Sequence, residues 1–194
     1  MYTHSVLEVL AIVCVNTSTS PHASTEVKAL AQRVLSLLCA IPARSAHSAS
    51  ALQITPSFLL GFALVALSAY IRTLCYRTLG RLFTFEISIQ PKHKLVTSGP
   101  YSIVRHPSYT GSIIGFAGSL VCAFCAGGWF CECGWLDTAV GKLFVVAYVL
   151  WNVQFASVML WRTGQEDQMM HGKFGKEWEG WREKVRYKII PGIF

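Results

Sequence analysis

Charged residues are scarce in this sequence, and acidic residues are the scarcest: 10 Asp and Glu stand against 17 Lys and Arg. Only 14% of the 194 residues are charged, whereas 53% are hydrophobic, and the mean hydropathy is +0.42. This balance excludes an ordinary soluble domain. The net charge of +7 does not indicate nucleic acid, because the cations fall in segments that flank apolar runs. We therefore expect an integral membrane protein.

Cysteine clusters with the spacing of a zinc site are also lacking. Four of the 7 cysteines form C-x2-C followed by C-x-C, but no second cluster of zinc-finger spacing follows them. Cys122 and Cys125 lie in an apolar run, where a thiol behaves as a small hydrophobic group. We therefore predict no metal site. A disulfide through Cys131 or Cys133 requires that their loop face an oxidising lumen.

The first 50 residues hold no clear domain signal. Residues 6–15 form a short apolar run that Glu8 interrupts and that no basic segment precedes, so they make a poor signal peptide and a short spanning helix. From Ser24 onward, apolar residues recur at helical spacing, which is typical of a helix lying on or shallowly in a membrane. We predict one or two membrane-associated helices in residues 1–50.

Long apolar runs make up much of the remaining chain. Residues 56–71, 111–130 and 143–161 are uncharged and close to the length of a spanning helix. Beyond residue 161 the chain becomes charged, and its apolar positions then follow one another three or four residues apart, as in an amphipathic helix. The predicted fold class is all-α: a polytopic membrane helical bundle with at least three strong spanning helices, a cytosolic loop and a C-terminal amphipathic helix. The amphipathic positions are Met170, Phe174, Trp178, Trp181 and Val185.

The basic residues assign the two sides of the membrane. The segment between the first and second apolar runs is rich in Lys and Arg, and so is the tail after the third run. The connection between the second and third runs has no Lys or Arg before Lys142. By the positive-inside rule, the basic loop and the basic tail both face the cytosol. They can therefore meet on one membrane face.

The basic loop ends in a stiff polar stretch, residues 95–111. Its glycines and prolines fix an irregular backbone path around several polar and aromatic side chains. In the tail, Arg162 lies four residues before Glu166, so an ordinary helical ion pair accounts for these two residues. The alternative is a site for a ligand, or two ligands, carrying both signs of charge. The side chains gathered in the loop are Tyr101, Arg105, His106 and Tyr109.

These segments together resemble a known family. The strings that carry the resemblance are His-Lys-Leu-Val-Thr-Ser-Gly at 93–99, Tyr101, Arg-His-Pro-Ser-Tyr at 105–109 with Gly111, Arg162 with Glu166-Asp167, and Phe174-Gly175. The chain resembles the isoprenylcysteine carboxyl methyltransferases and the wider membrane methyltransferase group that includes phospholipid N-methyltransferases. The resemblance covers residues 55–194, which would form the membrane methyltransferase domain.

The resemblance implies S-adenosylmethionine as the cofactor, bound by the cytosolic loop. Arg162 would hold the substrate carboxylate, and Glu166, the second catalytic residue, would contact the charged end of the cofactor. Glu86 is acidic where the family has an amide, and Asp167 replaces the second glutamate of the family's acidic pair. The implied cofactor-binding residues are Glu86, His93, Lys94, Leu95, Val96, Tyr101, His106, Pro107, Ser108, Tyr109 and Glu166.

The implied reaction is methyl transfer to the C-terminal carboxylate of a prenylated cysteine, giving a methyl ester. The implied partners are a prenylated protein or prenylcysteine and membrane lipid, without nucleic acid, in the endoplasmic reticulum membrane with the active site facing the cytosol. One alternative is a phospholipid N-methyltransferase, against which Arg162 argues because an amine substrate gains nothing from a guanidinium. A membrane sterol reductase shares the Arg-His-Pro start and a similar C-terminal pattern. The remaining alternative is an inactive membrane paralogue with a shortened amino-terminal region. The sequence does not indicate an oligomeric state.

Overall fold

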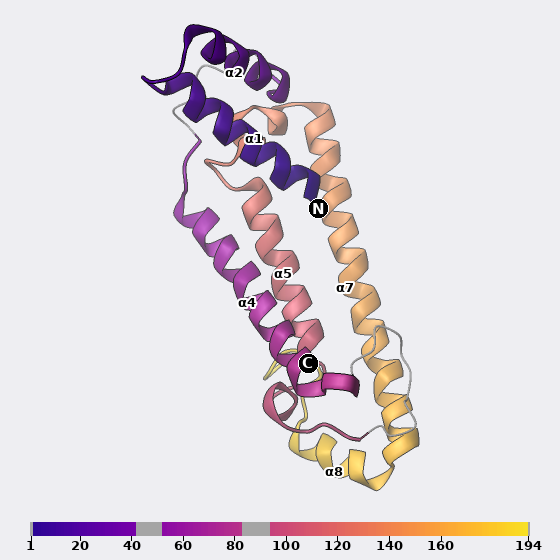
Figure 1. Cartoon of the computed structure of the whole chain (residues 1–194). Coiled ribbons are helices and arrows are strands. Elements are labelled where there is room, and N and C mark those ends of the chain that lie inside the picture. Colours follow the sequence, from indigo (N-terminus) through magenta and orange to yellow (C-terminus); the bar gives the residue numbers. More distant parts are fainter. Residues whose placement is uncertain (1, 42–51, 83–93, 194) are drawn as a thin grey trace. The chain divides into compact units, whose positions relative to one another are not determined.

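The computed structural model describes residues 2–41, 52–82 and 94–193, and those parts contain helices and no strand (Figure 1). The predicted all-α class is confirmed. The helices are α1 (Tyr2–Thr19), α2 (Thr25–Leu38), α4 (Pro56–Leu79), η2 (Gly80–Leu82), η3 (Gly99–Ser102), α5 (Pro107–Phe124), α6 (Trp129–Glu132), η4 (Trp135–Asp137), α7 (Ala139–Phe174) and α8 (Lys176–Lys184).

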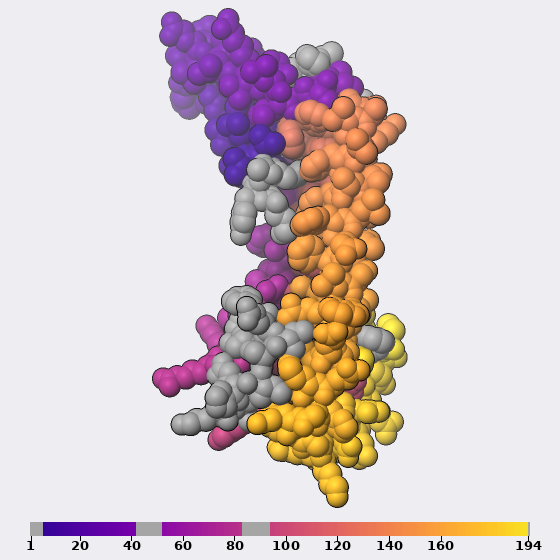
Figure 2. Space-filling view, turned by 90° about the vertical axis from the view of Figure 1, so that its right-hand side faces the viewer, coloured from indigo at the N-terminus to yellow at the C-terminus, as the bar shows by residue number. Residues whose placement is uncertain are grey.

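Three helical stretches are long and apolar enough to cross a membrane: Pro56–Leu82, Pro107–Glu132 and Ala139–Phe174. They contain the three runs predicted from the sequence and are consistent with an integral membrane protein. Figure 2 shows the side chains of α7, in orange, open to the viewer. Leu143, with 69% of its surface exposed, and Trp161, with 64%, lie on α7. Lipid is the solvent that such apolar surface requires.

The C-terminal amphipathic pattern divides into two helices. Helix α7 is 36 residues long: it continues past the apolar run and ends at Phe174, and α8 begins at Lys176. Gly175 between them has φ of +50°, a backbone conformation that side chains with a Cβ rarely adopt. Trp178 and Trp181 of α8 are buried, and Leu95 and Tyr101 pack against them. The aromatic positions of this helix therefore serve packing.

The chain divides into two compact units, whose boundaries fall inside α4, α5 and α7. The first unit comprises residues 1–63 and 118–150. In it, α1 and α2 pack with α6 around buried residues that include Ala11, Leu35, Trp129 and Phe130. This unit gives the N-terminal segment a hydrophobic core of its own.

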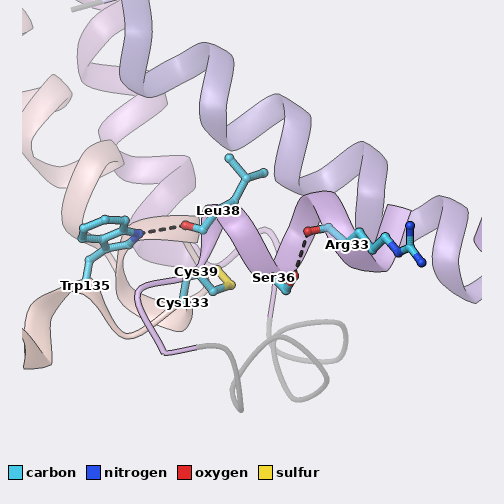
Figure 3. The surroundings of a disulfide bond; sticks show 6 residues. All are labelled: Arg33, Ser36, Leu38, Cys39, Cys133 and Trp135. Atoms are coloured by element: carbon cyan, nitrogen blue, oxygen red, sulfur yellow. Dashed lines mark hydrogen bonds between the residues drawn. A yellow bond between two sulfur atoms is a disulfide. The ribbon is translucent and has the colours of Figure 1, made fainter. Parts of the chain in front are cut away.

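A disulfide joins Cys39, just after α2, to Cys133, just after α6 (Figure 3). Beside it, Trp135 donates its indole N–H to the Leu38 carbonyl at 3.0 Å. The backbone N–H of Ala40 also donates to the Cys133 carbonyl, at 3.1 Å. The sequence left open a disulfide through Cys131 or Cys133, and the structure has one at Cys133. The partner Cys39 is 94 residues away and was not predicted.

The second unit comprises residues 64–117 and 151–194 and contains the candidate site. Here α4 and α5 approach closely at small residues of α5. A Cβ at Gly115 would lie 2.5 Å from Ser68 Oγ, and one at Gly111 would lie 3.0 Å from Arg72 Cγ. Larger side chains would force the two helices apart.

Candidate functional site

The C-terminal segment holds the Arg-His-Pro motif by its backbone. Arg105 N–H donates to the Tyr187 carbonyl at 3.0 Å, and His106 N–H donates to the Lys188 carbonyl at 2.7 Å. One turn into α5, the Thr110 hydroxyl donates to the Ile189 carbonyl at 2.6 Å. Pro107 then starts α5, where its missing N–H costs nothing. The segment after α8 therefore fixes the direction in which His106 and the first turn of α5 face.

Arg105 is a structural residue of this arrangement. Only 7% of its surface is exposed, and its Nη1 donates to the carbonyls of Val185 at 3.0 Å and Arg186 at 2.9 Å. Its Nη2 lies 3.3 Å from Asp167 Oδ2. A guanidinium buried among two carbonyls and a carboxylate is occupied in binding protein groups, which leaves it little capacity for a ligand.

Asp167 is the centre of the ion-pair cluster. Its Oδ1 lies 3.0 Å from His106 Nε2, and its Oδ2 is shared between Arg105 at 3.3 Å and Lys188 Nζ at 3.8 Å. The side chain is 11% exposed. Three cationic groups around one buried carboxylate stabilise its charge, and in return Asp167 connects α7 to the start of α5 and to the C-terminal segment.

His106 lies between the two adjacent acids of α7. Its Nδ1 is 3.3 Å from Glu166 Oε2, while its Nε2 is 3.0 Å from Asp167 Oδ1. Burial by itself would lower the pKa of His106, but hydrogen bonds to Asp167 and Glu166 outweigh it and raise the pKa. Because both ring nitrogens face carboxylates, the imidazolium with two N–H donors is the form that satisfies the site.

Glu166 and Arg162 are the more accessible members of the cluster. The Tyr109 hydroxyl donates to Glu166 Oε1, and Arg162 Nε lies 3.9 Å from the same oxygen. The side chains of Glu166 and Arg162 are 27% and 32% exposed, respectively. The adjacent acids therefore differ in role: Asp167 is enclosed by protein groups, whereas Glu166 presents an oriented carboxylate beside a guanidinium.

Tyr101 lies close to the cluster. Its carbonyl accepts a hydrogen bond from Trp181 Nε1 at 3.2 Å, which ties η3 to α8. Burial raises the pKa of the Tyr101 phenol, and the neighbouring Cys75 and Glu166 raise it further. The phenol is therefore neutral near pH 7, and its side-chain hydrogen-bond partner is Cys75.

The structure brings together His106, Tyr109, Arg162 and Glu166, as the resemblance implied, with Tyr101 nearby. The other predicted cofactor residues fall in the same unit: Lys94 is exposed, Leu95, Val96 and Ser108 are half-buried, and Pro107 is buried at the start of α5. Glu86 and His93 lie outside the described residues.

Sequence reasoning missed two residues that shape the site. It gave Asp167 only as a shortened version of a second glutamate, and it did not single out Lys188 at all. Lys188 lies in a short C-terminal stretch with no periodicity or motif, so nothing in its local sequence could have predicted its position. Arg105 did carry a signal, since it belongs to the Arg-His-Pro string.

The fold and the cluster define an all-helical protein with three membrane-length helices and a charged site formed by α5, α7 and the C-terminal segment. The sequence profile of the isoprenylcysteine carboxyl methyltransferase (ICMT) family matches residues 59–131. The family resemblance expected from the motifs is therefore confirmed.

The individual relatives give the same class and one other. A probable protein-S-isoprenylcysteine O-methyltransferase of Oryza sativa subsp. indica is 34% identical over 127 residues, 64% of this chain and 56% of the relative. Protein-S-isoprenylcysteine O-methyltransferase B of Arabidopsis thaliana is 43% identical over 63 residues, 31% of this chain and 32% of the relative. A Delta(14)-sterol reductase of Mus musculus is 29% identical over 101 residues, 52% of this chain and 20% of the reductase. The chain thus spans about half the length of the rice relative.

Proposed function

We propose that this chain is an S-adenosylmethionine-dependent methyltransferase that esterifies the C-terminal carboxylate of a prenylated cysteine. The observation that carries the proposal is the meeting of Tyr109 and His106 with Glu166, beside Arg162. This arrangement presents one carboxylate and one guanidinium in a membrane protein whose residues 59–131 match the ICMT family. Both charges have a counterpart in the two ligands of the proposed reaction.

The Glu166 carboxylate suits the cationic part of the cofactor. S-adenosylmethionine carries an ammonium and a sulfonium, and when bound it supplies an electrophilic methyl group. Glu166 is oriented by Tyr109 and His106 while 27% of its side chain stays exposed, so it can contact a cation without losing its own supports. The remaining cofactor contacts in this proposal are Glu86, His93, Lys94, Leu95, Val96, Tyr101, Pro107 and Ser108.

Arg162 suits the acceptor. A guanidinium binds a carboxylate through two parallel N–H donors, which fixes the plane of the carboxylate as well as its position. The acceptor carboxylate needs no general base, because a C-terminal carboxyl has a pKa of about 3.5 and is ionised at neutral pH. The contribution of Arg162 is therefore orientation.

Two independent features support a site that faces the cytosol from the endoplasmic reticulum membrane. Basic residues concentrate before the second spanning stretch and after the third. His106 precedes the stretch Pro107–Glu132 and Cys133 follows it, so one crossing puts the two residues on opposite sides. A disulfide such as Cys39–Cys133 fits an oxidising lumen, which supports an orientation with His106 on the cytosolic side. A prenylated protein would reach this side, with its lipid entering from the bilayer.

The direct test is an assay of the detergent-solubilised chain with methyl-labelled cofactor and N-acetyl-S-farnesylcysteine. The proposal expects label in a base-labile methyl ester of the carboxylate. Cofactor binding without turnover would instead support an inactive paralogue, and no cofactor binding would rule out both methyltransferase assignments.

A sterol reductase is the second candidate, because mouse and other sterol reductases match about half of this chain. A reductase would oxidise a nicotinamide cofactor in the presence of an unsaturated sterol. Parallel assays for nicotinamide oxidation and for methyl ester therefore separate the two functions. Labelling of phosphatidylethanolamine in place of the farnesylcysteine analogue would identify a phospholipid N-methyltransferase.

A further inference from the structure

Arg72 is a cation inside the apolar helix α4, within the membrane-length stretch Pro56–Leu82. Its Nε lies 3.0 Å from the Tyr76 hydroxyl oxygen, to which Nη2 also donates, and its Nη1 donates to Ser112 Oγ at 2.9 Å. Among the residues that the structure describes, no carboxylate pairs with Arg72. Two neutral hydroxyls therefore hold the full positive charge. A charge at membrane depth is costly and is retained where it has a functional role.

Helix packing holds this guanidinium in place. Gly111 of α5 has no side chain, and a Cβ there would lie 3.0 Å from Arg72 Cγ, so the arginine stem runs directly against the α5 backbone. Ser112 is 4% exposed, and its hydroxyl donates to the Ser108 carbonyl at 3.1 Å. That donation commits the hydroxyl hydrogen and turns the oxygen lone pairs toward Arg72.

The guanidinium keeps donors to spare. Of its five N–H groups, one on each of the three nitrogens is used by Tyr76 and Ser112, which leaves one N–H on each terminal nitrogen. Two donors on a planar fork match the oxygens of a carboxylate or a phosphate. Neutral partners thus hold the Arg72 guanidinium, and its positive charge and two of its N–H donors can still bind an anion.

Arg72 also lies close to the candidate site in the same unit. Its partner Ser112 follows Tyr109 by three residues on α5, so the two lie on adjacent helix positions. Cys75 and Tyr76, one turn after Arg72 on α4, raise the pKa of the Tyr101 phenol, as Glu166 does. Tyr101 is therefore a common neighbour of the Arg72 helix face and of the Glu166 carboxylate.

We propose that Arg72, with Tyr76 and Ser112, forms a second anion-binding site, which takes the oxygens of an anionic amphiphile in the cytosolic leaflet. Two sources share this chemistry: the carboxylate of a prenylcysteine, in which case the site rests on the proposed function and contributes to substrate selection beside Arg162, and the phosphate of a bilayer lipid. Val65, seven residues before Arg72 and therefore on the same face of α4, is exposed and would contact the hydrocarbon part.

The test compares Arg72→Gln with Arg77→Gln in the purified full chain in neutral detergent. Arg77 lies on the exposed surface of the same helix, so its replacement controls for loss of one charge. Binding is measured by tryptophan fluorescence for two matched pairs of probes: N-acetyl-S-farnesylcysteine against its methyl ester, and phosphatidic acid against phosphatidylcholine. No methyl transfer is needed, so failure of the proposed function does not prevent the measurement.

In the wild type we expect at least one anionic probe to bind about 10-fold more tightly than its neutral counterpart, the value of one strong charge-assisted contact. Arg72→Gln should lower that preference several-fold, with Arg162 retaining part of it for the farnesylcysteine, and Arg77→Gln should keep the preference of the wild type. If Arg72→Gln lowers the preference for farnesylcysteine over its methyl ester, the ligand of the site is a substrate carboxylate. If it lowers the preference for phosphatidic acid over phosphatidylcholine, the ligand is a bilayer phosphate. The proposal would be overturned if Arg72→Gln had the same preferences as the wild type. It would also be overturned if the wild type bound neither anionic probe more tightly than its neutral counterpart.

Two further variants keep the test valid if Arg72→Gln misfolds. Arg72→Lys keeps the charge with a different donor geometry, and we expect it to keep part of the preference. Ser112→Ala leaves Arg72 intact and removes one of the hydroxyls that orient it, and we expect a several-fold weaker preference with unchanged helical content by circular dichroism. If both variants preferred the anionic probe as strongly as the wild type does, the site would not depend on the guanidinium geometry or on Ser112, which would contradict the proposal.

Discussion

Asp167 Oδ1 lies 3.0 Å from His106 Nε2, while the same carboxylate pairs through Oδ2 with Arg105 and Lys188. One buried acid thus joins α7, the start of α5 and the C-terminal segment. The neighbouring Glu166 contacts the other side of the His106 ring and stays accessible. The two acids of the pair are therefore not interchangeable, and this difference has measurable consequences.

Asp167→Asn should destabilise the protein and weaken cofactor binding together. The substitution leaves Arg105 buried without its carboxylate, and breaking a buried ion pair costs about 3–5 kcal/mol. We expect a lower midpoint in chemical unfolding and about 10-fold weaker S-adenosylmethionine binding, since His106 would no longer be held from both sides. Asp167→Glu is the matched control, because it keeps the charge. Unchanged stability in Asp167→Asn would show that Asp167 does not organise the cluster.

His106 should make stability depend on pH. Its pKa is raised in the folded protein, so its contribution is fully present below the unfolded value of about 6.5 and is lost as pH rises through the folded pKa. We expect the thermal unfolding midpoint of the wild type to fall over that interval. His106→Gln should flatten the dependence, whereas His171→Gln, a change at an exposed histidine outside the cluster, should keep it. An identical pH profile in His106→Gln and the wild type would contradict the assignment.

The Cys39–Cys133 disulfide should stabilise the first unit. It closes a loop across a sequence separation of 94 residues, and disulfides of this kind typically contribute about 2–4 kcal/mol. Replacing both cysteines by serine should therefore lower the free energy of unfolding, as measured by denaturant titration. Cys14→Ser, which removes a buried free thiol, is the control for loss of a sulfur. Equal stability of the double variant and the wild type would mean that the bond does not stabilise the unit.

The same bond can test the side of the membrane. In sealed microsomes, a membrane-impermeant thiol reagent should label the Cys39 and Cys133 thiols only after reduction and permeabilisation. Labelling after reduction in intact vesicles would put this end of the chain on the cytosolic side and contradict the proposed orientation.

The sequence allowed the helical class, the three spanning stretches and the central residues of the site to be predicted. Uncharged runs of spanning length and the residue types of the Arg-His-Pro stretch are features of the local sequence. They can be recognised without knowing which distant residues come into contact.

Other features depend on contacts between distant residues. Cys39 gives no sign that it pairs with Cys133, since five other cysteines lie nearer to Cys133 or to Cys39 along the chain. Lys188 and the carbonyls of residues 185–189 reach the Arg-His-Pro motif only after the chain has folded back past α8. The contact between Arg72 of α4 and Ser112 of α5 likewise forms only in the folded chain.

The most direct test of the central claim is a steady-state comparison of wild type, Arg162→Ala and Glu166→Gln, with labelled S-adenosylmethionine and N-acetyl-S-farnesylcysteine varied in turn. We expect a labelled methyl ester from the wild type. Arg162→Ala should raise KM for the farnesylcysteine at least about 10-fold with little change for the cofactor, and Glu166→Gln should do the reverse, as loss of one charge-assisted contact predicts. No labelled ester from the wild type, or the same KM values in all three proteins, would contradict the account.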